Sequence, residues 1–150
     1  GKNLQYFDNT ANDRYIPCII ETSAGCDRMV LAVMADAYEE EEERVVMRFK
    51  PALAPIKVAV LPLVKKDGMP EVARKLFDDL RPVMKTFYDE GGSIGRRYRR
   101  QDEAGTPFGI TVDGDTLTHQ TVTLRERDSM NQERVSIDKV KDILIQRIAL

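Results

Sequence analysis

The sequence predicts an α/β fold with a mixed five-stranded sheet and about three helices between residues 51 and 150. A strand–helix–strand succession within residues 56–89 implies two parallel strands joined by a right-handed crossover. Residues 120–137 contain two strand-like segments on either side of a short turn, which is typical of an antiparallel hairpin. Parallel and antiparallel strands in one domain together predict a mixed sheet.

The length and charge of the chain limit the possible functions. Its 150 residues suit one domain, or one domain with an attached fragment, and are enough for a sizeable core. Lysine and arginine number 23 against 25 aspartate and glutamate, which gives a formal net charge of −2. Such a chain has no global attraction for nucleic acid. Any RNA site must therefore be a local basic patch.

Cysteine and histidine are scarce. Cys18 and Cys26 are eight positions apart without a CxxC spacing, and His119 is the single histidine. This set excludes a standard structural zinc site and a disulfide framework, so we expect a reducing compartment and no metal site. No apolar run is long enough to span a membrane, and the first residues do not resemble a signal peptide. We therefore expect a cytoplasmic protein that has no membrane partner.

The first 20 residues predict a hairpin and a strand. Turn-forming residues 8–13 separate Tyr6–Phe7 from Tyr15–Ile16, and these two flanks can pair. Residues 15–20 are apolar and rich in branched side chains, which favours a strand, with Pro17 at an edge or entry position. The sequence begins without methionine, which suggests a piece cut from a longer chain.

A turn that contains glycine follows at residues 21–28. It leads into residues 29–38, which are apolar nearly all round, as in a buried helix. Many nucleotide sites consist of a strand, a glycine-containing turn and a charged residue at the head of a helix. Arg28 can therefore contact a nucleotide, or it can simply pair with Asp27 or Glu21.

Five successive glutamates occupy residues 39–43. A run of like charge favours a solvated helix end or a loop over a binding site. We interpret it as the linker between an N-terminal part and the main domain. Residues 44–50 alternate loosely, and Pro51 and Pro55 hold the next segment extended.

A helix separates the first two strands of the main domain. Residues 56–63 form a continuous apolar strand, as expected in the middle of a sheet that helices cover. Pro70 opens the helix, Pro82 ends or bends it, and residues 84–89 form the next strand. The helix has apolar residues at helical spacing, namely Val72, Leu76, Phe77, Leu80 and Val83.

The next helix is strongly basic, because four arginines and a tyrosine fill residues 96–100. Ser93 can cap this helix, and Gly105 with Pro107 ends it before an apolar strand. One interpretation is a solvated basic face that pairs with nearby carboxylates. The other is a set of guanidiniums for phosphates and base edges, with a ring beside them for stacking.

The last part of the chain predicts three strands and a helix. Residues 108–113 are apolar, Gly114–Asp115 predicts a turn, and residues 120–127 alternate cleanly. Residues 134–137 can pair with that strand across a turn at 129–131. The C-terminal helix has an inner stripe that consists of Ile137, Val140, Ile143, Leu144 and Ile148.

Two arginines lie on the alternating strand. Arg125 and Arg127 are two positions apart, so they share one face of the strand. One possible role is pairing with Glu133 or Asp128. The other is contact with RNA, because a guanidinium can stack on an unpaired base while its donors reach base edges.

Three motifs resemble the glycyl-tRNA synthetase family, which belongs to the class II aminoacyl-tRNA synthetases. They are the proline-flanked apolar strand at 51–63, the glycine- and arginine-rich stretch at 91–109, and Thr-Leu-Arg-Glu-Arg-Asp-Ser-Met at 123–130. Their order matches the family over nearly the whole chain. The resemblance implies that residues 45–150 have the α/β fold of the family's anticodon-binding domain. It also implies that residues 1–44 are the end of the catalytic domain.

The turn at residues 21–28 resembles motif 3 of class II synthetases in its glycyl form. The resemblance implies ATP- and glycine-binding roles in the parent enzyme for Glu21, Ser23, Gly25 and Arg28. That enzyme would be a homodimer that ligates glycine to glycine tRNA with ATP and Mg²⁺. The other two class II motifs are absent from this sequence, so we expect no catalytic residue, no bound cofactor and no aminoacylation by the chain alone.

The resemblance also assigns anticodon binding to the basic helix and the late strand. The implied residues are Arg96, Arg97, Tyr98, Arg100, Arg125 and Arg127. The main hypothesis is an RNA-binding module whose partner is glycine tRNA. An alternative is a synthetase-like paralogue that uses the fold for protein contacts. A separate nucleotide enzyme is a further alternative, but the sequence has no P-loop, no GxGxxG after a strand and no nucleophile–base pair.

Overall fold

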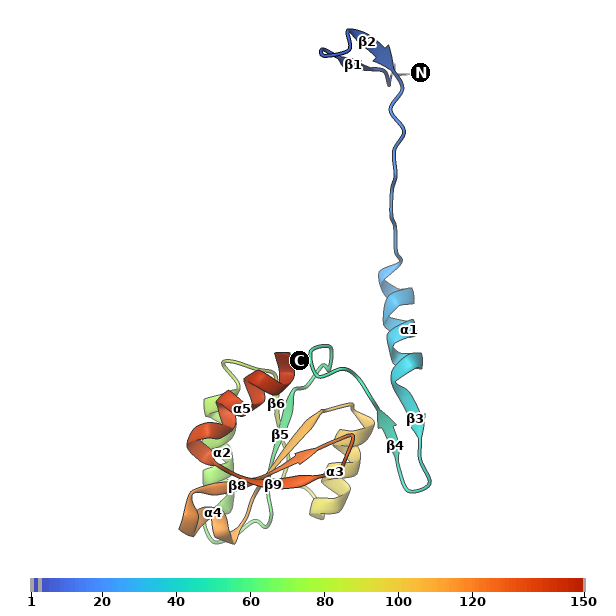
Figure 1. Cartoon of the computed structure of the whole chain (residues 1–150). Coiled ribbons are helices and arrows are strands. Elements are labelled where there is room, and N and C mark those ends of the chain that lie inside the picture. Colours follow the sequence, from blue (N-terminus) through green and yellow to red (C-terminus); the bar gives the residue numbers. More distant parts are fainter. Residues whose placement is uncertain (1, 3, 150) are drawn as a thin grey trace. The chain divides into compact units, whose positions relative to one another are not determined.

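The computed structural model describes residues 2 and 4–149. Residues 1–30 and residues 31–150 form two compact units, and helix α1 (Cys26–Ala37) contains the boundary between them (Figure 1). None of the helices in the described part of the chain is both long and apolar enough to cross a membrane.

The first unit contains a small antiparallel hairpin of β1 (Tyr6–Asp8) and β2 (Asp13–Tyr15). Its turn is held by the Asp8 carboxylate, which accepts a hydrogen bond from the backbone N–H of Thr10 at 2.8 Å. A carboxylate that binds the backbone two residues ahead is a common way to start a turn. The hairpin predicted from the turn cluster is therefore confirmed.

Residues 16–25 form neither a helix nor a strand. The strand predicted over residues 15–20 is therefore wrong beyond Tyr15. Ile19 and Ile20 are exposed, and no strand in the described chain pairs with them. A strand needs a hydrogen-bonded neighbour, so a run of branched apolar residues does not form one by itself.

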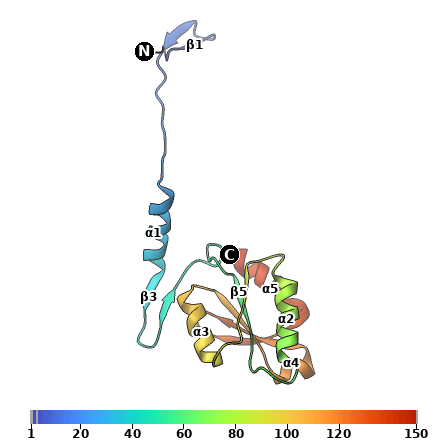
Figure 2. The same ribbon diagram turned by 180° about the vertical axis from the view of Figure 1, so that it is seen from behind.

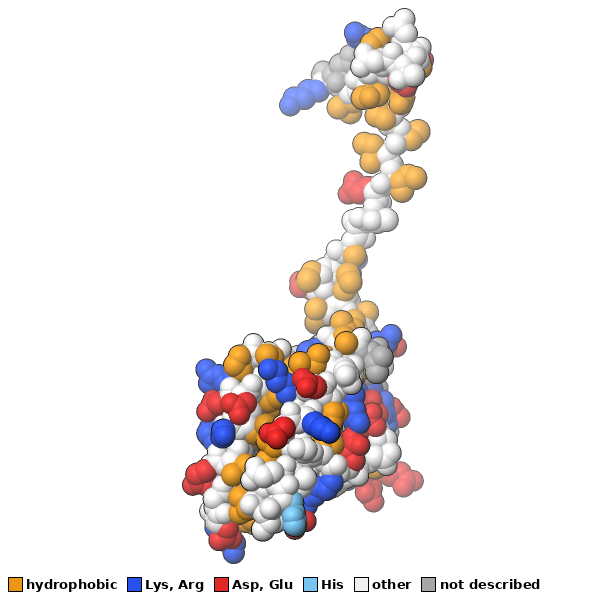
Figure 3. All heavy atoms as spheres, turned by 60° about the vertical axis from the view of Figure 1, so that its left-hand side comes forward, with side chains coloured by type: hydrophobic (Ala, Val, Ile, Leu, Met, Phe, Trp, Pro, Cys, Tyr) orange, Lys and Arg blue, Asp and Glu red, His pale blue; other side chains and the backbone are white. Residues whose placement is uncertain are grey.

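The apolar run at residues 29–38 correctly predicts helix α1 but not its burial. Leu31 is 68% exposed and Met34 is 48% exposed, whereas Ala37 at the end of the helix is buried. Apolar side chains lie on the surface along this helix and along the segment before it (Figure 3). An all-apolar helix indicates a buried environment, but these residues have no cover within the described chain.

A second hairpin, of β3 (Tyr38–Glu40) and β4 (Val45–Met47), follows α1 directly. The glutamate run predicted as a helix end or loop therefore begins in a strand, which corrects that prediction. Glu41 accepts two hydrogen bonds from the Arg44 guanidinium, at 2.7 and 2.9 Å. The positive charge of Arg44, which directly precedes β4, thus compensates part of the negative charge of the run.

The main sheet has five strands in the order β6-β5-β7-β8-β9. They are β5 (Val58–Pro62), β6 (Thr86–Tyr88), β7 (Phe108–Val112), β8 (Thr121–Glu126) and β9 (Gln132–Ser136). Strands β6, β5 and β7 are parallel, whereas β8 is antiparallel to β7 and β9 is antiparallel to β8. The predicted mixed sheet of five strands is confirmed.

In the described part of the chain, four helices pack with this sheet. They are α2 (Met69–Leu80), α3 (Ile94–Glu103), α4 (Gly114–His119) and α5 (Ile137–Ala149). Helices α2 and α5 lie on one side of the sheet and α3 on the other (Figures 1 and 2). The main core lies on the α2 and α5 side and includes Val58, Val60, Leu76, Leu80, Ile110, Val122, Leu124, Val140 and Leu144.

Helix α4 begins where a turn is predicted at Gly114–Asp115. The Asp113 carboxylate accepts the backbone N–H of Thr116 at 3.1 Å, and the Thr116 hydroxyl accepts the backbone N–H of Asp113 at 3.0 Å. This capping box starts a short helix. The prediction of a turn is therefore wrong, and the helices beside the sheet number four instead of about three.

Two glycines determine where α3 lies. The helix begins at the predicted cap, Ser93, and Gly105 follows its end with a φ of +76°, a value that favours glycine. Tyr98 packs over Gly109 of β7, where an added Cβ would lie 2.7 Å from the tyrosine ring. The absence of a side chain at Gly109 therefore allows α3 to approach the sheet closely.

Candidate nucleic-acid interface

The two halves of α3 contact different ends of the sheet. The N-terminal half lies at the carboxyl ends of β5 and β6, which Arg97 contacts. The C-terminal half lies beside the start of β7 and the end of β8, where Asp102 binds Arg125. In open α/β sheets, ligands bind outside the carboxyl ends of parallel strands. The N-terminal half of α3 therefore has the location expected of a binding site.

Arg97 joins α3 to the sheet. Its side chain is buried, with Nη1 2.6 Å from the carbonyl oxygen of Pro62 and 3.2 Å from that of Asp89. Nη2 donates to the carbonyl of Leu63 at 3.1 Å. Burial lowers the pKa of Arg97, but an arginine remains charged at neutral pH. Buried in this way, the guanidinium supports the helix and does not face solvent.

Arg96 and Arg100 are exposed. The Arg96 guanidinium has no partner among the described residues, whereas Arg100 donates to the Asp89 carboxylate and to the Gly91 carbonyl. Burial would raise the pKa of Asp89, but the Gly91 N–H and the Arg100 guanidinium outweigh it and hold this pKa below its ordinary value. Arg96 is therefore the cation of this helix that is ready to bind an added anion.

Arg125 lies between α3 and the sheet and is only 6% exposed. Its Nη1 and Nη2 donate to the two carboxylate oxygens of Asp102 at 2.8 and 3.0 Å. Its guanidinium carbon is 4.7 Å from the centre of the Tyr98 ring, and the Tyr98 hydroxyl is hydrogen-bonded to Thr111. A bidentate ion pair and a cation–π contact together fix the orientation of Arg125.

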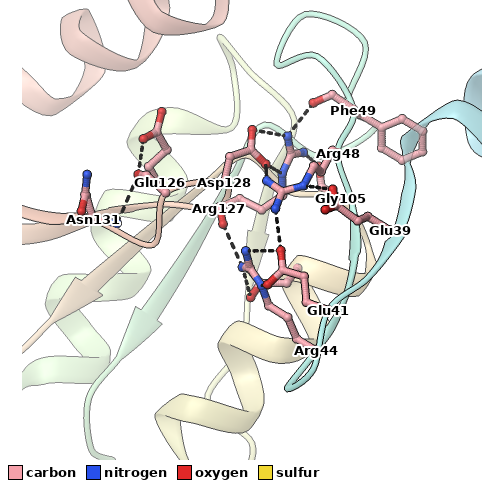
Figure 4. A network of polar contacts seen from close by, with 12 residues as sticks. Glu39, Glu41, Arg44, Arg48, Phe49, Gly105, Glu126, Arg127, Asp128 and Asn131 are labelled. Atoms are coloured by element: carbon pink, nitrogen blue, oxygen red, sulfur yellow. Dashed lines mark hydrogen bonds and ion pairs between the residues drawn. The ribbon is translucent and has the colours of Figure 1, made fainter.

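Arg127 is buried just beyond the end of β8. Its Nη1 donates to the carbonyl of Gly105 at 2.9 Å and its Nη2 to the carbonyl of Phe49 at 2.8 Å. It also pairs with Asp128, one of the partners considered from the sequence, at 2.7 Å from Nε (Figure 4). Arg127 therefore links α3 to the segment that follows the second hairpin.

The structure does not bring the six predicted anticodon-binding residues together on one exposed surface. Arg96 is exposed in the first half of α3 and Arg100 in its last turn, and Tyr98 is partly buried beneath Arg125. The remaining three are buried and bound to groups of the domain itself: Arg97, Arg125 and Arg127. Of the six residues, Arg96 and Arg100 are therefore the two whose guanidiniums solvent can reach freely.

The sequence did not identify one further exposed arginine on the α3 side of the sheet. Arg134 of β9 is paired with Thr123 of β8, and therefore shares the sheet face that α3 occupies. Its guanidinium donates to Asp113 at 2.9 Å and to Asp115 at 2.8 Å. The only sequence signal for this placement is the alternation along β9.

The residues predicted to bind ATP and glycine belong to the first unit. Glu21, Ser23 and Gly25 lie in the exposed segment before α1, and Arg28 lies in the first turn of that helix. The structure shows no hydrogen bond or ion pair among the described side chains of Glu21, Ser23 and Arg28. Among the described residues, no group of three or more His, Cys, Asp or Glu could hold a metal ion.

Residues 57–147 match the family described as "Anticodon binding domain". Curated relatives named glycine–tRNA ligase are 54% identical in Rhodopirellula baltica, 51% in Thermobifida fusca and 49% in Chlorobaculum tepidum. These alignments cover 93%, 99% and 99% of this chain but 28%, 34% and 32% of the relatives. The chain thus spans about a third of the length of the proteins that it matches.

The fold also occurs in a solved structure, the RNA-binding domain of threonyl-tRNA synthetase from Cryptosporidium parvum. The TM-score is 0.61 at 19% identity, and the alignment covers 67% of this chain and 25% of that one. At this identity the likeness concerns the fold alone. The family match covers the entire main sheet, helices α2 to α4 and all but the last two residues of α5. The chain therefore belongs to the anticodon-binding domain family and is homologous, over nearly its whole length, to glycine–tRNA ligases.

Proposed function

We propose that residues 45–150 bind the anticodon loop of glycine tRNA as the anticodon-binding domain of a longer glycine–tRNA ligase. The observation that carries this proposal is the family match over residues 57–147, combined with about 50% identity to glycine–tRNA ligases. The exposed arginines of α3 provide a local basic site on a chain whose net charge is −2. Such a site suits the phosphates of an RNA loop.

The six implied residues divide into two proposed roles. Arg96 and Arg100 contact phosphates, because both guanidiniums are exposed and only Arg100 has partners within the described domain. The three buried arginines hold α3 and β8 in position below the RNA; they are Arg97, Arg125 and Arg127. Tyr98 supplies an aromatic ring beside Arg125. Bringing Arg125 to a base edge would break its buried ion pair with Asp102, and bringing Arg127 there would break its buried hydrogen bonds to backbone carbonyls.

The first 44 residues are proposed to be the end of the catalytic domain of that longer protein. In it, Glu21, Ser23, Gly25 and Arg28 would contribute to the ATP and glycine sites, and the enzyme would be a homodimer. The exposed apolar side chains of α1 support this assignment, because so large an apolar surface marks an interaction site. The described residues do not form a Mg²⁺ site by themselves, so Mg²⁺ would enter together with ATP.

RNA titration of the 150-residue chain tests the proposed function. We expect an RNA stem-loop with a glycine anticodon to bind more tightly than the same stem-loop with a changed anticodon. Arg96→Ala should weaken both and reduce the slope of log Kd against log salt by about 0.7, as expected for one lost phosphate contact on a single strand.

The matched control is Arg81→Ala. Arg81 is also exposed, but it follows α2 on the other side of the sheet and pairs with Asp78. It should leave RNA binding unchanged. Equal binding of all RNAs by the unaltered chain, or equal losses in the Arg96 and Arg81 variants, would contradict the proposed function.

A further inference from the structure

The two ends of α3 are attached to the domain in different ways. Near the N-terminus, the helix supplies its own arginine, Arg97, to carbonyl groups of the sheet. Near the C-terminus it supplies a carboxylate, Asp102, which receives arginines from two other parts of the chain. The second attachment therefore depends on segments outside the helix.

Asp102 is a buried carboxylate, with 1% of its side chain exposed. Arg125 occupies both of its oxygens, and Nη1 of Arg44 donates to Oδ2 at 3.0 Å. Arg44 is equally buried, and Glu41 supplies the second negative charge that balances the two guanidiniums. Removing one member of a buried ionic group leaves its partners uncompensated. The position of Arg125 therefore depends in part on Arg44.

Arg44 belongs to the β3–β4 hairpin and not to the main sheet. The same Nη1 that binds Asp102 also donates to the carbonyl oxygen of Arg127 at 2.8 Å. One nitrogen thus bridges α3 and the end of β8, as the close view of the network shows for the Arg127 contact (Figure 4). The hairpin is held by this bridge against both of the elements that carry the proposed RNA-binding residues.

Packing limits the hairpin to this position. An added Cβ on Gly105, which follows α3, would lie 2.4 Å from the Phe49 ring and 2.9 Å from the carbonyl oxygen of Met47. The hairpin and the end of α3 are therefore in close contact. The Arg48 N–H donates to the Ala37 carbonyl at 2.6 Å, which continues the pairing of β3 with β4 to the last residue of α1.

We propose that Arg44 is a positioning residue for RNA recognition: through Asp102 it fixes the tilt of α3 and the orientation of Arg125, so that the docking of the β3–β4 hairpin is coupled to RNA binding. This inference rests on the proposed function, because it assumes that α3 meets the RNA. Arg44 itself touches no RNA. Arg44 acts through Asp102, which lies on α3, the helix that also carries the exposed Arg96.

Arg48 offers a matched control in the same hairpin. Its guanidinium pairs with Glu39, Glu41 and Asp128, whereas no hydrogen bond or ion pair between described residues joins its side chain to α3, and 31% of that side chain is exposed. Replacing either arginine by lysine preserves the charge but removes the planar fork of donors. The pair Arg44→Lys and Arg48→Lys therefore separates attachment to α3 from the loss of a guanidinium elsewhere in the hairpin.

The test uses the 150-residue chain, with three measurements on each variant: binding of the glycine-anticodon stem-loop, binding of the changed stem-loop, and the NMR signal of the Arg125 Nε–H group. Binding is measured well below the unfolding midpoint of each variant, so that all molecules are folded. Arg44→Lys should shift the Arg125 signal without RNA and weaken binding of the glycine stem-loop about threefold to tenfold. Its preference over the changed stem-loop should fall, and Arg48→Lys should change neither property.

The outcomes separate this inference from the function on which it rests. If the unaltered chain binds neither stem-loop, the proposed function is wrong, and the role of Arg44 in RNA recognition is wrong with it. If the unaltered chain binds and Arg96→Ala weakens binding, but the Arg44→Lys chain binds both RNAs as before, the proposed function stands and the positioning role of Arg44 is wrong. Equal losses in the Arg44 and Arg48 variants would also overturn it, because they would reduce the effect to the loss of any guanidinium from the hairpin.

Discussion

The two units, residues 1–30 and residues 31–150, contain similar apolar side chains, but these side chains differ in how much of their surface is buried. Ile20 of the first unit is 96% exposed, whereas Ile110 of β7 is completely buried. Ile110 lies on a strand that pairs with β5 and β8, and it belongs to the core on the α2 and α5 side. Burial of such a side chain contributes about 1.5–3 kcal/mol. The comparison teaches that the second unit is stable through its own contacts, whereas the first contains surface that nothing described in this chain covers.

The same substitution at two glycines, one in each unit, tests this difference. The loss of stability at Gly105 should be the largest of the predicted effects. Gly105→Ala places a Cβ 2.4 Å from the Phe49 ring at a φ of +76°. The left-handed backbone costs about 1–2 kcal/mol and the overpacking about 1–3 kcal/mol. Together they should destabilise the second unit by about 3 kcal/mol. Chemical denaturation followed by circular dichroism measures this change.

The matched variant is Gly25→Ala in the first unit. Here an added Cβ meets only the Arg28 side chain, at 3.6 Å, which is ordinary contact, and no positive φ is involved. The midpoint for unfolding of the second unit should stay where it is. A comparable loss in both variants would mean that the two units unfold as one cooperative structure, and the contrast drawn above would disappear.

The fold of the second unit follows closely from its sequence because its elements cover one another. The apolar strand that ends at Pro62 and the alternating strand β8 both pair with neighbouring strands of the chain. The residues that their sequence patterns predict to be buried are therefore buried. The same kinds of pattern mislead at residues 15–20 and along α1, whose partners are not present among the described residues. Local sequence predicts which face is apolar, but it does not show what will cover that face.

The candidate site is less predictable for a related reason. The spacing of Arg125 and Arg127 correctly indicates one shared face, but it does not show that this face is buried against α3. Arg44 makes hydrogen bonds to partners 58 and 83 positions away in the chain, and no local pattern identifies such contacts. The Ser93 cap, by contrast, joins two residues that are three positions apart, so the local sequence predicts it directly.

The acid response should also distinguish the two units. Burial would raise the pKa of Asp113, but the Arg134 guanidinium and the Thr116 N–H outweigh it and lower this pKa from the ordinary 3.8. A carboxyl group whose pKa is lowered by folding stabilises the folded state above the unfolded value, and this stabilisation is lost as the pH falls through the folded value. The unfolding midpoint of the second unit should therefore remain constant from pH 7 to about pH 5 and decline below about pH 4.

Asp113→Asn should lower the unfolding midpoint at pH 7 and make its decline in acid shallower. Asparagine still caps α4 well, so the variant removes mainly the ion pair with Arg134. Asp8→Asn, in the first hairpin, should leave the acid profile of the second unit unchanged. Thermal unfolding between pH 7 and pH 3 measures how the midpoint of each variant depends on pH. If the midpoint declines equally in the Asp113 variant and in the unaltered chain, the ion pair with Arg134 does not cause the acid response.

The smallest expected effect concerns nucleotide binding by the first unit. Glu21 and Ser23 lie in an exposed segment, and Arg28 has no partner among the described residues to hold its guanidinium. Fixing the backbone of each residue costs about 1–2 kcal/mol, and ATP alone would have to supply this for the whole segment. Titration calorimetry of the 150-residue chain with ATP should therefore show no saturable heat, and Arg28→Ala should not change that result or the stability of the second unit. Micromolar ATP affinity that Arg28→Ala abolishes would show instead that the segment forms a nucleotide site without the rest of the longer protein.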